Sequence, residues 1–581
     1  MKANIIYIAA FSALLFHGCD FLDRYPYDEV TSKTVYSQAT LAEAAVLGVY
    51  SNIKSDYNSA DLSSLNWDAF STVMDAYEAA YYSNYKYLSG VIQPDDASFL
   101  NYWKRFYEGI YRANDVIANI DQVPDMAEET KAVRKAECLA LRAYFYYRLN
   151  ALWGGVPVYL ENLAPEEYTK GRSSEADVWQ RVIADCTDAL SVEALPGKYN
   201  QSDSDYGRVT KGMVYMLRAK AYMWLKEWDL AEKDLLEIGK LGYGLFKGSY
   251  ADLFKEANEG CEEMVFSVQM RAEASQGNVF TRTYGFFHVA GGGGNNTFFA
   301  NTNFVDSYQN ADGTDFSYDD IIPGYSSMSP RARSVYFLRD GLTAAEQEKM
   351  EKYGADMTKY LSTGNEARIM QAFEDRDPRL SASVITPYSS HSGGFTGTAI
   401  DYTLRWPFRD SNNSPYDLET KSNDKFLYNI RKFVTVGVEY TNSTYNPVDC
   451  PVYRYADVLL CLAECANEQD DINAAIGYVN EVRSRAGVAV IPAGSVASKE
   501  EMRSRIIKEK RWELAFEEQL YFEELRWGVW KEDKFTGNGL FEIWGEPVYS
   551  YGWGGDKYLH WPIPSKEKEM NTNLVQNEGW N

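Results

Sequence analysis

A helical period of apolar positions is the clearest pattern in the chain. Between residues 130 and 153, apolar side chains recur every three or four residues, as on one face of an amphipathic helix, at Val133, Ala136, Ala140, Ala143 and Tyr147. The pattern ends at Gly154 and Gly155, and glycine commonly follows the last turn of a helix. We therefore predict a long helix over 130–153.

Two further segments predict pairs of helices joined by short turns. In the first, helical spacing runs over 214–228 and continues in a second helix over 229–238. In the second, a stripe over 455–466 is followed, after the polar EQDDI, by another over 474–482. Each pair sets large residues against alanines at a length near the 34-residue tetratricopeptide unit. We predict a mainly α, tetratricopeptide-like scaffold of degenerate helical hairpins, with few short strands.

The segment 244–449 lacks this periodicity. It contains GGGGNN at 291–296 and polar, turn-rich runs around 326–330 and 389–397. Long loop regions inside a compact protein usually carry function, so we expect this segment to lie over the helices and bear the ligand surface. The glycine run lacks the Lys-Ser/Thr and the strand–turn–helix context of a phosphate-binding loop.

The first residues predict an export signal. MKANIIYIAAFSALLFHGC places Lys2 before a short apolar run, too short to cross ~30 Å of hydrocarbon as a helix. The run ends at Gly18-Cys19, which resembles a bacterial lipobox. We predict that residues 1–18 are removed as a signal peptide and that Cys19 is acylated. No later segment holds 18 uninterrupted apolar residues, so the lipid on Cys19 is the membrane anchor we expect.

Composition excludes several classes of function. The 58 Lys and Arg against 83 Asp and Glu give a net charge of −25, which repels nucleic acid. The four histidines are too scattered to indicate a metal site, and DGTD at 312–315 lacks the spacing of a calcium loop. Cys461 and Cys465, four residues apart on a helical stripe, suit buried small hydrophobes. We predict no metal and no cofactor. The 45 Tyr, 27 Phe and 14 Trp offer many flat apolar surfaces to a ligand.

Several sequence blocks follow one another in a fixed order along the chain. The blocks are CDFLDRYP at 19–26, ALRAYFYY at 140–147 with LWGGVP at 152–157, DGTD at 312–315, DRDPR at 375–379, RYADVLL at 454–460, VRSRAG at 482–487, KRWELAFE at 510–517 with LRW at 525–527, WPIP at 561–564 and NLVQN at 573–577. In this order they resemble the SusD/RagB family of surface glycan-binding lipoproteins. Each block is weak alone, but their order over the whole mature chain is specific.

The matching blocks themselves have structural explanations. Arg376 and Arg379, on either side of the Asp-Pro turn, suit fixed hydrogen bonds to backbone. Glu509, Glu513 and Glu517, at four-residue steps beside Lys510 and Arg511, predict a helix with exposed ion pairs. We therefore interpret the blocks as scaffold rather than as ligand contacts.

The resemblance implies an organisation and a function. It implies one compact domain, in which an N-terminal helical part at 19–243 and a C-terminal helical part at 450–581 enclose a variable, loop-rich ligand region at 244–449. It also implies a lipid-anchored protein on the outer surface of the outer membrane. Such a protein captures a polysaccharide or oligosaccharide and passes it to a SusC-like, TonB-dependent transporter, on which its helical side packs.

Aromatic residues and amides in two stretches and one loop are our candidates for the glycan site. In 66–87, Trp67 and Tyr82 fall off the helical stripe on which we place Phe70, Tyr77 and Tyr81. The other candidates lie in the middle segment, and they are Phe287, His288, Asn295, Asn296, Trp406 and Arg409. Sugar rings stack on aromatic faces, and amides pair with sugar hydroxyls.

Two alternatives from other classes remain open. A tetratricopeptide-like scaffold could dock proteins of an outer-membrane complex without binding glycan. A glycoside hydrolase would need two carboxylates about 5–10 Å apart at a sugar cleft, and the adjacent acids at 517–518 and 523–524 point in different directions on a helix. No nucleophile–base arrangement is legible, so we predict a binding protein and not an enzyme.

Overall fold

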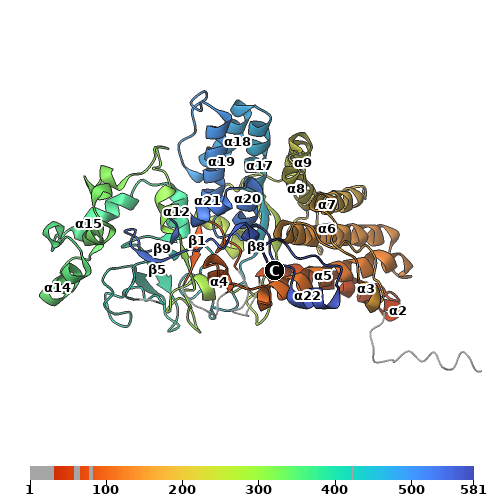
Figure 1. Cartoon of the computed structure of the whole chain (residues 1–581), viewed down its shortest axis with the longest axis horizontal. Helices are drawn as coiled ribbons and strands as arrows, with labels where there is room; N and C mark the ends of the chain where they lie inside the picture. Colours follow the sequence, from red (N-terminus) through yellow and green to blue (C-terminus); the bar gives the residue numbers. More distant parts are fainter. Residues whose placement is uncertain (1–31, 58–65, 78–82, 422, 581) are drawn as a thin grey trace, which may run out of the picture.

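The computed structural model describes residues 32–57, 66–77, 83–421 and 423–580. Cys19 and Tyr82 lie outside these described residues. The described chain is mainly α-helical with few short strands, as the sequence predicts. In Figure 1, one group of helices lies at the right and a second group lies at the top. Helices α14 and α15 lie at the left end of the molecule, opposite α2 and α3.

The helices before residue 244 form a row in which each long helix packs on the next. They are α2 (Ser32–Val35), α3 (Ala39–Tyr57), α4 (Ser83–Leu88), α5 (Ala97–Asn119), α6 (Glu128–Trp153), α7 (Glu175–Leu190), α8 (Lys211–Trp224) and α9 (Trp228–Lys240). Contacts run from α3 to α5 and then through α6, α7 and α8 to α9. The long helix predicted over 130–153 is α6, which ends where Gly154 takes a φ of 64°.

The hairpin predicted over 214–238 is α8 and α9, with one boundary corrected. We placed Trp228 on the first helix, but α8 ends at Trp224 and Trp228 begins α9. The turn between them includes Lys226 at a φ of 60°, a left-handed conformation that stops the first helix.

The second helical group continues the same row. It comprises α17 (Tyr455–Glu468), α18 (Ile472–Ala486), α19 (Lys499–Leu514), α20 (Leu520–Trp527) and α21 (Trp530–Phe535). The last helix, α22 (Ser565–Met570), packs instead on α5 of the first group. Helix α17 packs on α9 although the whole segment 244–449 separates them in sequence. The predicted hairpin over 455–482 is α17 and α18, and both Cys461 and Cys465 are buried and unpaired within it.

Between the two groups the chain forms only short elements. The helices are α10 (Tyr250–Leu253), α11 (Phe280–Tyr284), α12 (Thr302–Ser307), α13 (Pro330–Arg333), α14 (Ala344–Tyr353), α15 (Asn365–Met370) and α16 (Pro378–Ser383). Long loops connect them, in line with the turn-rich sequence. The domain boundaries at 243 and 449 stay a prediction, because this segment shares a continuous apolar core with both helical groups.

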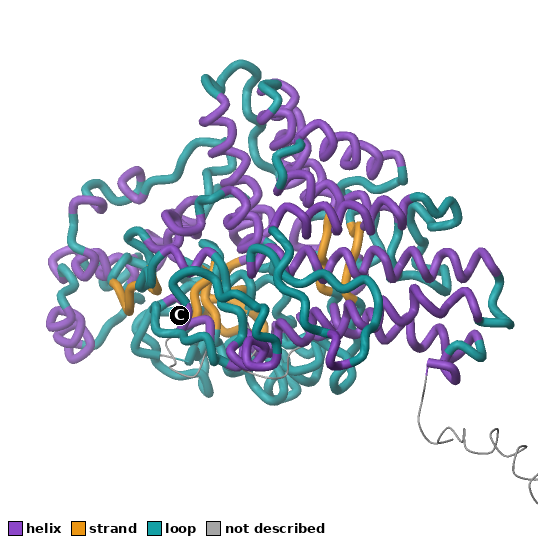
Figure 2. The backbone as a smooth tube through the Cα atoms, turned by 45° about the vertical axis from the view of Figure 1, so that its right-hand side comes forward, coloured by secondary structure: helices purple, strands orange, loops and turns teal. Residues whose placement is uncertain are grey.

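The strands pair in twos, always antiparallel. They are β1 (Met74–Ala76) with β3 (Phe298–Ala300), β2 (Met264–Val268) with β8 (Cys450–Arg454), β4 (Val384–Ile385) with β7 (Asn429–Ile430), β5 (Ser390–Gly393) with β6 (Ile400–Thr403), and β9 (Gly539–Phe541) with β10 (Pro547–Ser550). Figure 2 shows them as short orange pieces among loops and helices. Two of these pairs, β1 with β3 and β2 with β8, join the segment 244–449 to the chain on either side of it.

A buried network of ion pairs joins the loop region to the second helical group. Arg454 contacts the carboxylates of Glu263, Glu513 and Glu517, and none of these four side chains is more than 3% exposed. Arg379 pairs in the same network with Asp377, Glu509 and Glu513. The prediction that the Glu509, Glu513 and Glu517 series forms exposed ion pairs is wrong, because their partners arrive from other segments and cover them.

Two details of that prediction are also corrected. Helix α19 ends at Leu514 instead of running on through the block, and Phe516 and Glu518 take positive φ angles of 69° and 65°. Arg376 does donate to backbone carbonyls, among them that of Tyr308 at 2.6 Å, as predicted. Arg379 instead binds carboxylates.

Candidate functional site

Two of the predicted aromatic contacts belong to the core. Trp67 is fully buried, with its ring centroid 4.8 Å from that of Tyr102 and 5.6 Å from that of Trp561. Residues 67–73 form turns and Met74–Ala76 form β1, so the helical stripe that we used to set Trp67 apart does not exist. Trp406 is 5% exposed and packs on Trp544. The expectation that these rings lie exposed to a ligand is wrong.

Two of the side chains that we predicted as polar ligand contacts, Asn296 and Arg409, form hydrogen bonds within the protein. Asn296 is buried, and its amide nitrogen donates to the carbonyl oxygen of Tyr284 and to the side chain of Asn429. Arg409 reaches the surface, but its guanidinium donates to both oxygens of Asp417, at 3.0 and 2.7 Å. The Asn296 side chain is not free to orient a ligand, and the Arg409 side chain is held by Asp417.

The structure does bring Phe287 and His288 into one cluster of rings, which we call the aromatic platform: Phe287, His288, Phe395 and Tyr402. The Phe287 and Phe395 centroids lie 5.2 Å apart, and both side chains are exposed, by 46% and 37%. His288 is buried beneath them and stacks on Tyr402 at 5.1 Å. Exposed, adjacent aromatic faces supported by a second layer of rings suit the stacking of a flat apolar ligand face.

A carboxylate and the glycine-rich loop border the platform. The Glu419 carboxylate lies 3.5 Å from Nδ1 of His288, and burial lowers the pKa of that histidine. Asn295 is half-buried in the glycine-rich loop, and a side chain at Gly293 in this loop would touch the ring of Phe287. The carboxylate supplies a hydrogen-bond acceptor beside the rings.

A large cavity opens on the other side of the segment 436–438. Its volume is about 910 Å³, near the upper end of the range for small-ligand sites. Val436 lines it and is 44% exposed, and the neighbouring Val438 is 51% exposed. Gly394, next to Phe395 of the platform, packs against the backbone of Gly437 and Val438. One short segment thus separates the platform from the cavity.

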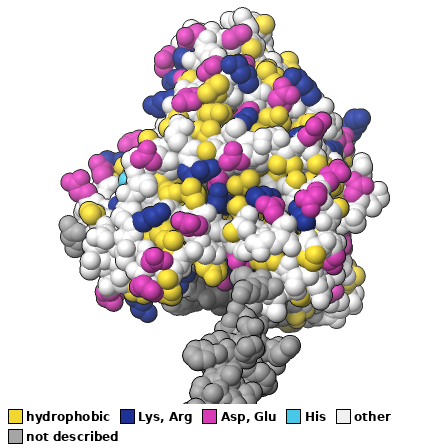
Figure 3. All heavy atoms as spheres, turned by 90° about the vertical axis from the view of Figure 1, so that its right-hand side faces the viewer, with side chains coloured by type: hydrophobic (Ala, Val, Ile, Leu, Met, Phe, Trp, Pro, Cys, Tyr) yellow, Lys and Arg dark blue, Asp and Glu magenta, His cyan; other side chains and the backbone are white. Residues whose placement is uncertain are grey.

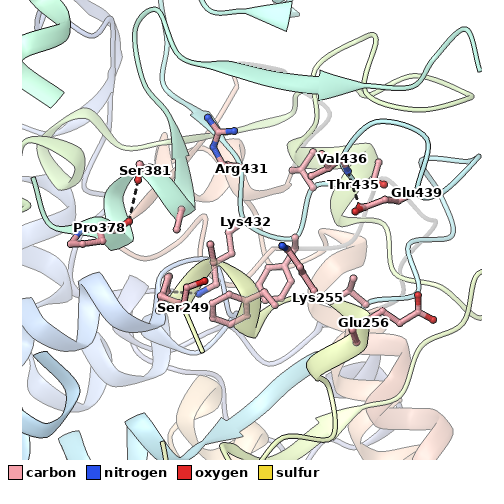
Figure 4. Close-up of a pocket in the computed structure, with 18 of the residues that line it drawn as sticks. Ser249, Lys255, Glu256, Pro378, Ser381, Arg431, Lys432, Thr435, Val436 and Glu439 are labelled. Atoms are coloured by element: carbon pink, nitrogen blue, oxygen red, sulfur yellow. Dashed lines mark hydrogen bonds between the residues drawn. The ribbon is translucent and has the colours of Figure 1, made fainter. Parts of the chain in front are cut away.

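The cavity combines apolar walls with charged groups (Figure 4). Tyr250, Phe254, Phe433 and Tyr440 contribute rings, and we call the site the Arg431 cavity after the cation at its edge. It lies against the buried network, since Lys432 at its floor donates to Glu517 and is 1% exposed on its side chain. Burial lowers the pKa of Lys432 to about 8.

One close pair of carboxyl groups, Asp68 and Glu518, lies inside the core. Burial raises the pKa of Asp68 and of Glu518, and mutual repulsion adds to the rise for Glu518. Glu518 accepts hydrogen bonds from the backbone N–H of Trp67 and from the hydroxyl of Tyr284, so this pair sits inside the core. Within the described residues, no group of His, Cys, Asp and Glu is arranged to hold a metal ion.

Sequence reasoning missed Phe395, Tyr402 and Arg431. Phe395 follows two glycines in a turn-rich run, and an aromatic residue flanked by glycines was the available signal. Arg431 stands in a segment with no pattern, and its position at a cavity depends on contacts between β5 and the segment 431–440 that no local period encodes.

Comparison with known proteins decides the family. A family model described as "SusD family" matches residues 262–580, and one described as "Starch-binding associating with outer membrane" matches residues 20–223. The chain belongs to the SusD family. The resemblance found in the sequence blocks is therefore confirmed.

Relatives and solved structures of this family match nearly the whole chain. The SusD-like protein P25 of Formosa agariphila is 24% identical over 601 aligned positions, covering 100% of this chain and 99% of its own. A SusD-like protein from Bacteroides fragilis has the same fold, with a TM-score of 0.73, 22% identity and coverage of 96% of this chain and 100% of its own. Surface glycan-binding protein A from Bacteroides thetaiotaomicron, in complex with laminarihexaose, gives a TM-score of 0.61 at 19% identity, covering 93% and 99%.

Described helices show no candidate for a membrane span: none is both long and apolar enough to cross a bilayer.

Proposed function

We propose that this SusD-family protein binds a polysaccharide or oligosaccharide at the cell surface through the aromatic platform. The observation that carries the proposal is the exposed pair Phe287 and Phe395 beside Glu419. Sugars present apolar CH faces that stack on rings, and their hydroxyls need polar partners nearby. The laminarihexaose bound to a protein of the same fold supports the ligand class.

The platform holds only a few sugar units, so affinity depends on chain length. Single sugars stack weakly, and each further ring in contact adds to the total. The Arg431 cavity next to the platform offers room for the continuation of the same chain. We therefore expect binding of an oligosaccharide of several units and negligible binding of a monosaccharide.

Lipid on Cys19 tethers the protein to the outer membrane in this proposal, and a SusC-like, TonB-dependent transporter receives the glycan. The family description, which includes association with the outer membrane, supports this location. Figure 3 looks onto the helical end, where apolar side chains lie among charges of both signs. Copurification with a large barrel from native membranes in mild detergent tests the partner. Recovery of free protein while the transporter is intact would contradict it.

In this proposal the protein binds the glycan without cleaving it. The carboxyl pair Asp68 and Glu518 has raised pKa values, but the core encloses it, so it cannot flank a glycosidic bond.

Affinity gel electrophoresis of the soluble form against a panel of plant, algal and fungal polysaccharides tests the function. The proposal predicts retardation by at least one polysaccharide and no reducing ends released after long incubation. A protein that runs unretarded on every gel, while copurifying with an outer-membrane complex, would favour the docking alternative.

A further inference from the structure

One cation of the Arg431 cavity has no acidic partner within the described part of the chain. Lys432 pairs with Glu517, Lys255 pairs with Asp252 at 2.6 Å, and Arg485 pairs with Glu263 and Glu513. Arg431 makes no ion pair. Its guanidinium donates to the carbonyl oxygen of Ser390 at 2.9 Å and to the hydroxyl of Ser389 at 3.3 Å.

The histidine beside Arg431 does not supply the missing charge. Nε2 of His391 lies 2.8 Å from the carbonyl oxygen of Thr435, so this nitrogen carries the proton and donates. Nδ1 is then the acceptor facing the guanidinium of Arg431 at 3.5 Å. Burial lowers the pKa of His391 to about 4, and the ring is neutral at pH 7.

Arg172 has no acidic partner but is saturated by fixed oxygens, whereas Arg431, like Arg368 and Arg376, keeps a buried Nε without a hydrogen bond. Of these last three arginines, Arg431 is the one that lines the cavity. Arg172 uses all three of its guanidinium nitrogens, which donate to the carbonyls of Trp153, Gly154, Gly155 and Val575 and to the side chain of Asn577. In Arg431, Nε is buried and has no hydrogen-bond partner. Burial of a cation with so little compensation is costly, and an arginine stays protonated under these conditions.

Arg431 lies at a cavity in which a ligand could reach its guanidinium. It lines the same cavity as the rings of Phe433 and Tyr440, and the carboxylates of Glu256 and Glu439 stand apart from its guanidinium in Figure 4. Those two carboxylates accept from Tyr440 and from the backbone of Val436. Arginine presents a planar fork that matches a carboxylate or a sulfate.

We propose that the Arg431 cavity takes the carboxylate or sulfate group of an acidic saccharide. This inference rests on the proposed function and names the substrate class: a glycan bearing uronic acids or sulfate esters. The anionic group sits on Arg431, the sugar faces lie along the cavity rings, and the rest of the chain extends over the aromatic platform. The net charge of −25 disfavours polyanions in general, so recognition depends on this local cation.

Calorimetry with matched pairs of oligosaccharides tests the proposal. The probes are uronate-rich oligosaccharides with their carboxyl-reduced forms, and sulfated oligosaccharides with their desulfated forms. Wild type should bind one acidic probe at least about tenfold more tightly than its neutral counterpart, and added salt should weaken the acidic interaction. Carboxyl reduction and desulfation show which of the two anions is recognised.

Arg431→Gln should lose this preference by about tenfold or more while binding neutral probes as wild type does. Arg368→Gln is the matched control, because the Arg368 guanidinium also binds only neutral oxygens, those of Lys359 and Asn365, and lies outside the cavity. Should Arg431→Gln fail to fold, Arg431→Lys keeps the charge without the fork and should bind the acidic probe at an intermediate affinity.

The results separate this inference from the proposed function. Tight binding of neutral probes only, or an acidic preference that persists in Arg431→Gln, would overturn the anion site and leave glycan binding standing. No binding of any probe or of any polysaccharide in the gel panel would overturn both.

Discussion

Trp67 lies in the core, where its ring packs on Tyr102, Phe522 and Trp561. Its place off a helical stripe suggested exposure, yet residues 67–73 form turns in which successive side chains meet the core from several directions. Phe287, by contrast, is exposed next to a glycine-rich loop, and that loop was legible in the sequence. Local patterns indicate exposure only where the local structure that they assume is the one that forms.

Replacing Trp67 should destabilise the protein without any ligand present. Trp67→Ala removes a ring packed on Tyr102, Phe522 and Trp561, and large-to-small changes at such sites cost about 3–5 kcal/mol. Urea unfolding measures the loss. Phe287→Ala is the control and should stay within about 0.5 kcal/mol of wild type because its ring is exposed. Equal midpoints for Trp67→Ala and wild type would show that Trp67 is not a core residue.

At the scale of elements, the helices were predictable and their partners were not. The periods of α6, α8, α9, α17 and α18 are local properties, and each appears in the sequence. The burial of Glu513 and Glu517 was hidden because the spacing of charges on a helix is the same whether solvent or Arg454 faces them. Strand pairs such as β2 with β8 are equally hard to predict from local sequence, since their registers depend on chain segments far apart.

Removing one charged side chain from the buried ion network should lower the free energy of unfolding strongly. Arg454→Met leaves Glu263, Glu513 and Glu517 without their shared cation, and breaking a buried pair in this way costs about 3–5 kcal/mol. Arg505→Met removes an exposed pair with Glu501 and should change the free energy of unfolding by under about 1 kcal/mol. Similar losses for the two variants in thermal or urea unfolding would contradict the central role of the network.

The Asp68 and Glu518 pair should make stability fall as pH rises toward neutrality. Burial raises both pKa values in the folded protein, so between about pH 4 and pH 7 the folded state holds a proton that the unfolded state has released. Stability then decreases with pH across that window. Glu518→Gln should flatten the slope measured by urea unfolding at a series of pH values. An unchanged slope in this variant would assign the pH dependence to other groups.

At the scale of the whole molecule, the family blocks were informative because they lie in the scaffold. They mark fixed features such as the Arg379 and Arg454 ion pairs, and their order identified the family over the full chain. They could not locate the ligand site, which we propose lies in the segment between the helical groups. In that segment, Phe287 and His288 of the platform were predicted, whereas Phe395, Tyr402 and the cavity residue Arg431 were missed.

The lipid that we propose on Cys19 would hold the protein at the membrane. Cys19→Ala should abolish acylation and release the protein from the membrane, because lipid on Cys19 is the attachment that we propose. Metabolic labelling with a fatty-acid analogue and membrane fractionation measure the two effects. Acylated, membrane-bound protein in the variant would refute this mode of attachment.

The central claim is that Phe287 and Phe395 form the surface on which the glycan lies. Calorimetry with an oligosaccharide of the polysaccharide that retards the protein on gels tests it most directly, using wild type, Phe287→Ala and Phe395→Ala. Loss of an engaged ring costs on the order of 2 kcal/mol, so each variant should bind about 30-fold more weakly at an unchanged melting temperature. Tyr111→Ala, which removes a 52% exposed ring from α5, should bind as wild type does. Wild-type affinity in both phenylalanine variants would contradict the account.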